Sequence, residues 1–134
     1  MTNPALLELS LPMLVEAIHR GEISAESVAT TYLDRIAKYD PSLGAYLTVQ
    51  RDETLEAARA IDQKRARGEP LGPLAGVPIA IKDALCTKDV PTTGGSRILV
   101  RSTGGPADPN DGFRPPYDAT VVARLRAADA LLIG

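Results

Sequence analysis

The chain has 134 residues, 44% of them hydrophobic, and a formal net charge of -2 at pH 7. That length fits one domain with a modest hydrophobic core. Its 15 basic and 17 acidic residues are interleaved, which excludes the basic field that drives binding to nucleic acids. The single cysteine, Cys86, excludes an internal disulfide. Because no apolar stretch reaches the roughly 18 residues of a membrane span and no signal peptide is recognisable, we expect a cytoplasmic protein.

Two helices are predicted at the beginning of the chain. Ser10 can cap the first, which Gly21 ends, because one face carries apolar residues at the i, i+3, i+4, i+7 spacing: Leu11, Leu14, Val15 and Ile18. Ser24 can cap the second, whose apolar side chains recur at intervals of four and which Pro41 is expected to close. The pair is predicted to form a helical hairpin.

An alternation of strands and helices follows and predicts an α/β fold. Residues 45–49 are rich in β-formers, Asp52 can cap a charged helix running to about Arg67, and residues 77–81 are an apolar strand. Together they predict a β-α-β unit with parallel strands. Asp118 can cap a last helix with apolar residues at Val121, Val122 and Leu125, and residues 131–133 supply another strand.

Two further stretches carry information about the organisation of the chain. Residues 101–116 hold seven glycines and prolines in sixteen positions, which predicts a flexible surface loop. The chain then ends on the apolar run 130–134 without a polar tail. A buried strand needs neighbours on both sides, so we expect the chain to be a fragment of a longer protein.

The main candidate for chemistry is Lys82, which ends the apolar run 77–81. Ligands of parallel sheets lie outside the carboxyl ends of the strands, and strand alternation puts Lys82 on the face of Pro78 and Ala80, which leave room beside it. A lysine buried there could act as a base towards a serine. Alternatively, it is an exposed strand-end lysine whose stem covers apolar surface and whose ammonium pairs with Asp83. The residues alone leave both interpretations open.

The loop after Lys82 offers hydroxyl groups and two glycines. It either presents backbone N–H groups to an anion or makes a turn, and its candidates for substrate binding are Thr92, Thr93, Gly94, Gly95 and Ser96. His19 at a helix C-terminus suits the helix dipole rather than catalysis. Cys86 lacks the neighbours of a metal ligand, and the acidic loop near residue 108 lacks the spacing of a calcium site, so no metal is expected.

Two motifs carry a family resemblance. "GPLAGVPIAIKDALCTKDVPTTGGSRIL" and "PPYDATVVARLRAADALLIG" together resemble the amidase signature family. The resemblance implies an α/β/α sandwich with a central mixed, largely parallel sheet and an N-terminal helical hairpin, of which residues 1–134 would be the N-terminal portion of a single amidase domain. It also implies a Ser-cisSer-Lys triad in which Lys82 is the catalytic lysine. The two serines are expected beyond Gly134.

Within the family, the residues Cys86, Thr87 and Lys88 are similar to the glutaminase subunit of the aspartyl/glutamyl-tRNA(Asn/Gln) amidotransferase, its A subunit. That likeness implies an enzyme whose ammonia converts Glu-tRNA(Gln) or Asp-tRNA(Asn) to the amide form. The B and C subunits of the amidotransferase would be its partners in a heterotrimer. ATP and Mg²⁺ would be used by the B subunit, which would also hold most of the tRNA, and no cofactor would bind to this chain.

Two other functions remain open: a stand-alone amidase for another carboxamide, and a non-catalytic fragment or scaffold. The 134-residue chain alone is expected to be inactive, because it has one of three triad residues. The sequence also departs from the family pattern. Ala84 stands where Asn is common, Asp89 stands where Gly is common but can adopt a left-handed turn, and residues 101–112 look like an insertion.

Overall fold

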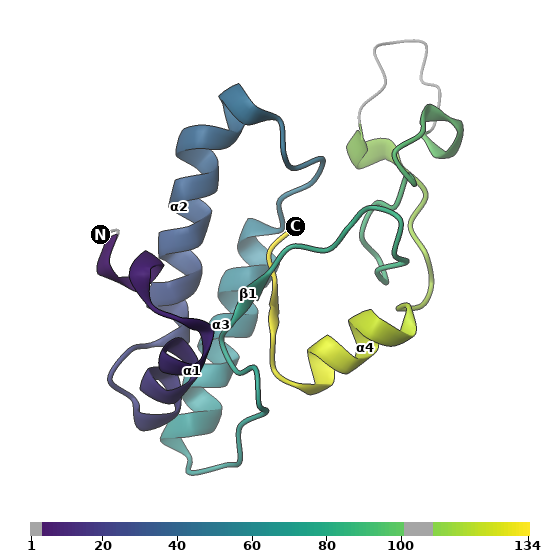
Figure 1. Cartoon of the computed structure of the whole chain (residues 1–134). Coiled ribbons are helices and arrows are strands. Elements are labelled where there is room, and N and C mark those ends of the chain that lie inside the picture. Colours follow the sequence, from purple (N-terminus) through teal and green to yellow (C-terminus); the bar gives the residue numbers. More distant parts are fainter. Residues whose placement is uncertain (1–3, 101–108) are drawn as a thin grey trace.

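The computed structural model describes residues 4–100 and 109–134. Within these residues, two short strands run side by side in the middle of the molecule, with α2 and α3 on one side and α4 on the other (Figure 1). In chain order the elements are the 3-10 turn Pro4–Glu8, α1 (Leu11–Arg20), α2 (Ala25–Leu43), α3 (Arg51–Ala66), β1 (Pro78–Ile79), the 3-10 turns Arg97–Leu99 and Pro109–Asp111, α4 (Thr120–Ala127) and β2 (Leu131–Leu132). The predicted α/β class is confirmed. No helix in these two ranges is long and apolar enough to cross a membrane.

The boundaries of α1 and the start of α2 follow the local signals in the sequence. Helix α1 begins after Ser10 and ends at Gly21, which adopts the left-handed conformation with φ 76°. Helix α2 begins after Ser24, whose Oγ accepts the backbone N–H of Ser27 at 3.1 Å. Both helices are therefore confirmed, although the Ser10 side chain makes no capping hydrogen bond.

The prediction that Pro41 closes α2 is wrong, because the helix continues to Leu43. The last turn is held together by Asp40. Its backbone carbonyl accepts the N–H of Gly44 at 2.7 Å, and its carboxylate accepts the N–H of Ala45 at 2.7 Å. These two bonds satisfy groups that a helix end leaves open, so the chain turns at Gly44 rather than at the proline.

Helix α3 fastens the turn between α1 and α2. The carboxylate of Asp62 accepts the backbone N–H groups of Ala25 at 2.9 Å and Glu26 at 3.0 Å, so a residue of α3 caps α2. One turn further along α3, Arg65 donates to the carbonyls of Ile18 at 2.9 Å and Ile23 at 3.2 Å. The helical hairpin is thus oriented by side chains from a third helix.

The segment between α2 and α3 differs from the prediction. Residues 45–49 form no strand, and α3 begins at Arg51 after Gln50 rather than at a cap on Asp52. The segment instead passes the end of β2, where the Gln50 N–H donates to the Ile133 carbonyl at 3.1 Å. The predicted pairing of 45–49 with 77–81 is therefore wrong.

Strand β1 instead pairs with β2, in parallel and in the register Pro78↔Leu131 and Ile79↔Leu132. Hydrogen bonds extend this pairing in both directions, from Leu131 N–H to the Val77 carbonyl at 2.8 Å and from Ile81 N–H to the Gly134 carbonyl at 2.7 Å. The connection between the two strands contains α4. The parallel arrangement is confirmed, but its two strands are Pro78–Ile79 and Leu131–Leu132, shorter than the predicted runs 77–81 and 131–133.

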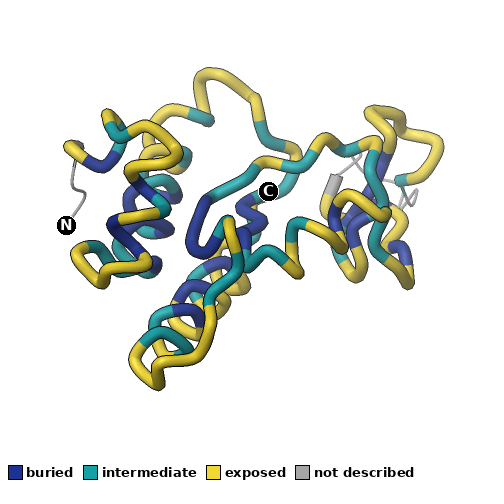
Figure 2. The backbone as a smooth tube through the Cα atoms, turned by 60° about the horizontal axis from the view of Figure 1, so that its bottom comes forward, coloured by how far each residue is buried: buried dark blue, intermediate teal, exposed yellow. Residues whose placement is uncertain are grey.

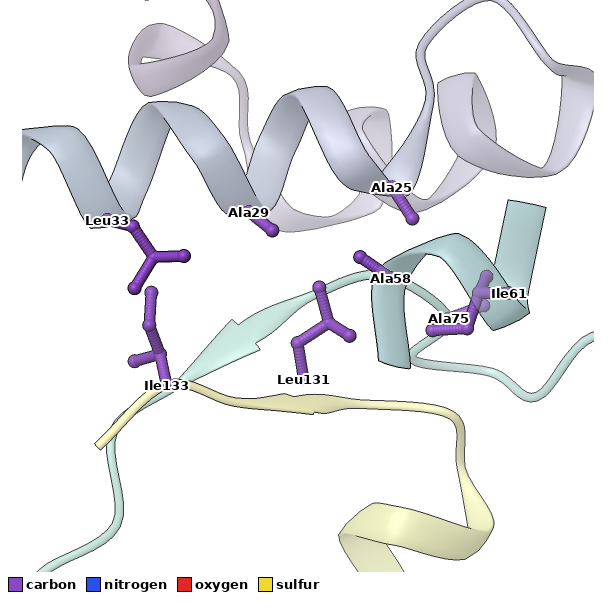
Figure 3. Close-up of a cluster of buried hydrophobic side chains, with 8 residues drawn as sticks. All are labelled: Ala25, Ala29, Leu33, Ala58, Ile61, Ala75, Leu131 and Ile133. Atoms are coloured by element: carbon purple, nitrogen blue, oxygen red, sulfur yellow. The ribbon is translucent and has the colours of Figure 1, made fainter. Parts of the chain in front are cut away.

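The core lies between these strands and the helices. Figure 2 shows buried residues along the inner sides of the helices and in the last strand. Leu131 and Ile133 point towards α2 and α3 (Figure 3). The helix positions facing them are mostly small, which lets the backbones approach closely; the cluster comprises Ala25, Ala29, Leu33, Ala58, Ile61, Ala75, Leu131 and Ile133.

Helix α4 begins after Ala119, so the predicted cap on Asp118 is wrong. The Asp118 carboxylate instead accepts the N–H of Lys88 at 2.7 Å and pairs with Arg126 at 3.0 Å. Of the expected apolar face, Val122 is fully buried and Val121 is 45% exposed. Residues 101–108, the first half of the predicted loop 101–116, lie outside the described residues, and the flexibility of the loop stays a prediction. In its described half, residues 109–111 form a 3-10 turn.

Candidate active site

Lys82 lies just beyond the carboxyl end of β1, at the mouth of a cleft of about 380 Å³. The lysine side chain is exposed, so the described residues do not desolvate its ammonium. Three parts of the chain form the walls of the cleft: the segment after α2, the end of the β1 strand with the loop that follows, and the C-terminal glycine. Its lining residues are Ala45, Tyr46, Leu47, Thr48, Gln50, Ala80, Ile81, Lys82, Asp83, Leu85, Thr87, Val90, Pro91, Thr92 and Gly134.

Asp83 binds the loop rather than its neighbour Lys82. Its carboxylate accepts the backbone N–H of Thr93 at 2.7 Å, the Thr93 hydroxyl, and the N–H of Gly95 at 3.0 Å. Partial burial raises the pKa of Asp83, but these hydrogen bonds outweigh burial and hold the pKa below its ordinary value. The alternative in which Asp83 pairs with Lys82 is therefore wrong, since the ion pairs among the described residues do not include Lys82.

The loop 92–96 does bind an anion, and that anion is the chain's own carboxylate. Gly94 and Gly95 adopt left-handed conformations with φ 65° and 68°, which turns their N–H groups towards Asp83. Ser96 caps the following turn by accepting the Ile98 N–H at 3.3 Å. Of the five substrate-binding candidates, Thr92 alone lines the cleft, and the contacts of Thr93, Gly94, Gly95 and Ser96 hold the loop together.

The loop is also fastened to the segment before α4. Backbone N–H groups donate from Ala119 to Cys86 at 2.7 Å, from Asp89 to Pro115 at 3.0 Å and from Thr92 to Phe113 at 2.8 Å. Asp89 adopts the left-handed conformation, with φ 61°, as expected for a position where glycine is common. One wall of the cleft is thus held by bonds on two sides, to Asp83 and to residues 113–119.

The other candidates, His19 and Cys86, are not among the residues that line the cleft. The His19 ring is exposed, with Nε2 3.2 Å from the Gly72 carbonyl. Cys86 donates weakly to the Tyr117 hydroxyl at 3.9 Å. In the part of the chain that the structure describes, no group of three or more His, Cys, Asp or Glu side chains could hold a metal ion.

Sequence reasoning missed the opposite wall of the cleft. Tyr46, Thr48 and Gln50 line it because the segment after α2 runs beside the end of β2 and not in the sheet. Burial, followed by the negative charge of Asp40, raises the pKa of Tyr46. The one signal in the sequence was the glycine at position 134, since a glycine after an apolar strand can mark a place where another backbone approaches closely. In the structure, a Cβ on Gly134 would lie 2.5 Å from the Thr48 carbonyl oxygen, so the segment after α2 leaves no room for a side chain there.

Lys82 thus lines a cleft just beyond the carboxyl end of β1, beside a Gly-Gly-Ser loop. The family model described as Amidase matches residues 27–134. This chain is 50% identical over 129 residues to the A subunit of glutamyl-tRNA(Gln) amidotransferase from Salinispora arenicola (strain CNS-205), a match that covers 96% of this chain and 24% of that relative.

Solved structures agree. The native peptide amidase from Stenotrophomonas maltophilia superimposes with a TM-score of 0.79 and 32% identity, over 95% of this chain and 24% of that one. A bacterial aryl acylamidase of the amidase signature enzymes gives a TM-score of 0.79 and 28% identity, over 94% of this chain and 24% of that one. The chain therefore belongs to the amidase family, and the α/β fold that the resemblance implied is confirmed. It spans about a quarter of the length of the curated relatives it matches.

Proposed function

We propose that this chain is part of the glutamine-hydrolysing A subunit of a tRNA-dependent amidotransferase in the cytoplasm, and that Lys82 is the base of its Ser-cisSer-Lys triad. The observation that supports the proposal is the position of Lys82, which lies just beyond the carboxyl end of β1 and lines the cleft. The choice of subunit rests on the 50% identity to the Salinispora arenicola relative, against 32% and 28% for the peptide amidase and the aryl acylamidase.

In the proposed reaction, Lys82 in its neutral form takes a proton through the bridging serine from the serine that attacks the carboxamide of glutamine. A bond forms from the serine oxygen to the carbonyl carbon, the C–N bond breaks, and the nitrogen leaves as ammonia with the proton returned to it. Water then hydrolyses the acyl-enzyme to glutamate. The two serines would lie in the part of the relatives that this chain does not cover, and that part would also desolvate the exposed Lys82 ammonium.

The ammonia would be used by a partner. The B subunit would activate the charged tRNA with ATP and Mg²⁺ and accept the ammonia, and the C subunit would complete the complex. The interleaved charges of this chain, with a net charge of -2, support a division in which the B subunit holds most of the tRNA.

The test uses a swapped subunit, in which this chain replaces the region of the Salinispora arenicola relative that it matches. Co-purified with the B and C subunits, it should release ammonia from glutamine. We expect Lys82→Met to reduce kcat by at least 10²- to 10⁴-fold, roughly the range of general acid–base catalysis. Lys88→Met is the matched control, because Lys88 is an exposed lysine on the same loop and does not line the cleft.

Three outcomes separate the possible functions. Loss of activity in Lys82→Met with retention in Lys88→Met supports the proposal. Ammonia release from simple amides without the B and C subunits would instead support a stand-alone amidase. A swapped subunit that binds its partners and melts cooperatively, yet hydrolyses no amide, would contradict any catalytic role and favour the scaffold.

A further inference from the structure

Asp83 receives the N–H groups of three consecutive residues. Thr93 and Gly95 donate to its carboxylate at 2.7 and 3.0 Å, and Gly94 donates to its backbone carbonyl at 2.9 Å. The Thr93 hydroxyl, on a side chain that is 5% exposed, adds a fourth hydrogen bond. Hydrogen bonds to a charged carboxylate are about twice as strong as neutral ones, so this is the main attachment of the loop to the strand end.

The main chain around Lys82 is held on both sides. Before it, the Ile81 N–H donates to the Gly134 carbonyl at 2.7 Å and keeps that end of the strand in the sheet. After it, Asp83 is tied to the loop, and the Lys82 carbonyl itself accepts the Leu85 N–H at 2.9 Å. By contrast, Lys82 takes part in no ion pair among the described residues, so the contacts of its main chain fix where its Cα lies and in which direction its Cα–Cβ bond points.

We propose that Asp83 is a positioning residue, which fixes the direction in which Lys82 leaves the backbone by binding the loop 93–95. This inference rests on the proposed function, because it gives Asp83 a role in setting the geometry of the base. The carboxylate is committed to the loop through its hydrogen bonds from Thr93 and Gly95. Its loss should therefore lower kcat and leave KM close to that of the wild type.

The central variant is Asp83→Asn in the swapped subunit. Asparagine keeps the size of the side chain and one acceptor oxygen. Its NH₂ group replaces the second carboxylate oxygen and therefore cannot accept the hydrogen bond that this oxygen accepted. We expect kcat to fall by about 10²-fold, the loss that a displacement of roughly 1 Å can cause. Asp89→Asn is the matched control, since Asp89 lies on the same loop, is exposed, and has a left-handed backbone that asparagine tolerates.

Thr93 provides a conservative rescue. Thr93→Val removes the hydroxyl that donates to Asp83 and keeps the shape, whereas Thr93→Ser keeps the hydroxyl. We expect Thr93→Val to reduce kcat by about tenfold, as for one hydrogen bond to a charged group, and Thr93→Ser to stay near wild type. A purely structural role would not separate these two variants in kcat once both are folded.

Amide hydrogen exchange of the same proteins reads the loop directly. Asp83→Asn should accelerate exchange at residues 93–95 at least tenfold and Asp89→Asn should not. If Asp83→Asn exposes the loop but keeps wild-type kcat while Lys82→Met is inactive, the positioning role is refuted and the proposed function stands. If Lys82→Met is active, the proposed function fails and the role of Asp83 fails with it. Unchanged exchange at 93–95 in Asp83→Asn also refutes the inference.

Discussion

Asp62 of α3 caps a helix other than its own, and replacing it with alanine should destabilise the hairpin of α1 and α2. Asp62→Ala removes two hydrogen bonds from a carboxylate, those from Ala25 N–H at 2.9 Å and Glu26 N–H at 3.0 Å. At a net contribution of about 1.5 kcal/mol each, the lower end of the range for charged groups, the loss in unfolding free energy is about 3 kcal/mol. Because Ala25 is fully buried, water cannot replace the lost acceptor there.

The comparison within the same helix end is Ser24→Ala. It removes one neutral capping bond, from the Ser27 N–H at 3.1 Å, and should lower the unfolding free energy by about 1 kcal/mol. Asp52→Ala is the control, since Asp52 is exposed on the same helix as Asp62 and should change stability by no more than about 0.5 kcal/mol. The expected order is therefore Asp62→Ala, then Ser24→Ala, then Asp52→Ala.

The assay is urea unfolding of the 134-residue chain followed by far-ultraviolet circular dichroism. With a total stability of about 5–15 kcal/mol for a domain, a loss of about 3 kcal/mol moves the urea midpoint clearly, and it lowers the melting temperature by about 10 °C. If Asp62→Ala is no less stable than Ser24→Ala, the carboxylate does not cap α2 and the reasoning is refuted.

Two further predictions concern the core and the response to acid. Leu131→Ala should lower the unfolding free energy by about 3–5 kcal/mol, because Leu131 is fully buried. Leu43→Ala is the control and should change the unfolding free energy little, because Leu43 is 72% exposed. If urea unfolding shows equal losses for the two variants, Leu131 does not belong to the core. Partial burial raises the pKa of Asp129, but hydrogen bonds from Lys64 and Gly72 outweigh burial and lower the pKa, as loop bonds do for Asp83. The stabilisation from both carboxylates is therefore complete above about pH 4 and is lost as the pH falls through their folded-state pKa values. Asp83→Asn and Asp129→Asn should each make the unfolding free energy fall less steeply with decreasing pH. An unchanged dependence of the unfolding free energy on pH would show that the carboxylate does not contribute in this way.

The sequence predicted the elements whose signals are local. Ser24 and Gly21 mark helix ends through contacts with residues three or four positions away, and such contacts do not depend on the rest of the chain. The apolar run before Lys82 likewise predicted a parallel strand with the lysine at its carboxyl end. The expectation that Lys82 is a catalytic base came from the family motifs. The residues alone allowed both a base and an ordinary surface lysine.

Two of the failures share one physical cause, which is competition from residues distant in sequence. Residues 45–49 have strand-forming composition, but β1 pairs with β2, more than 50 positions further along the chain, and the segment after α2 is held at the end of β2 by the bond from Gln50 N–H to the Ile133 carbonyl. Asp118 could cap its own helix, but its carboxylate is bound by the Lys88 N–H at 2.7 Å.

The candidate site shows the same division. The sequence by itself determined that a lysine follows the strand and that a loop of hydroxyl and glycine residues comes next. Only the tertiary structure decided what that loop binds, because the N–H groups of Thr93 and Gly95 reach a carboxylate 10 and 12 positions earlier once β1 and β2 have paired. A backbone donor bonds to whichever acceptor folding brings within reach, and for this loop that acceptor is Asp83 rather than an external anion.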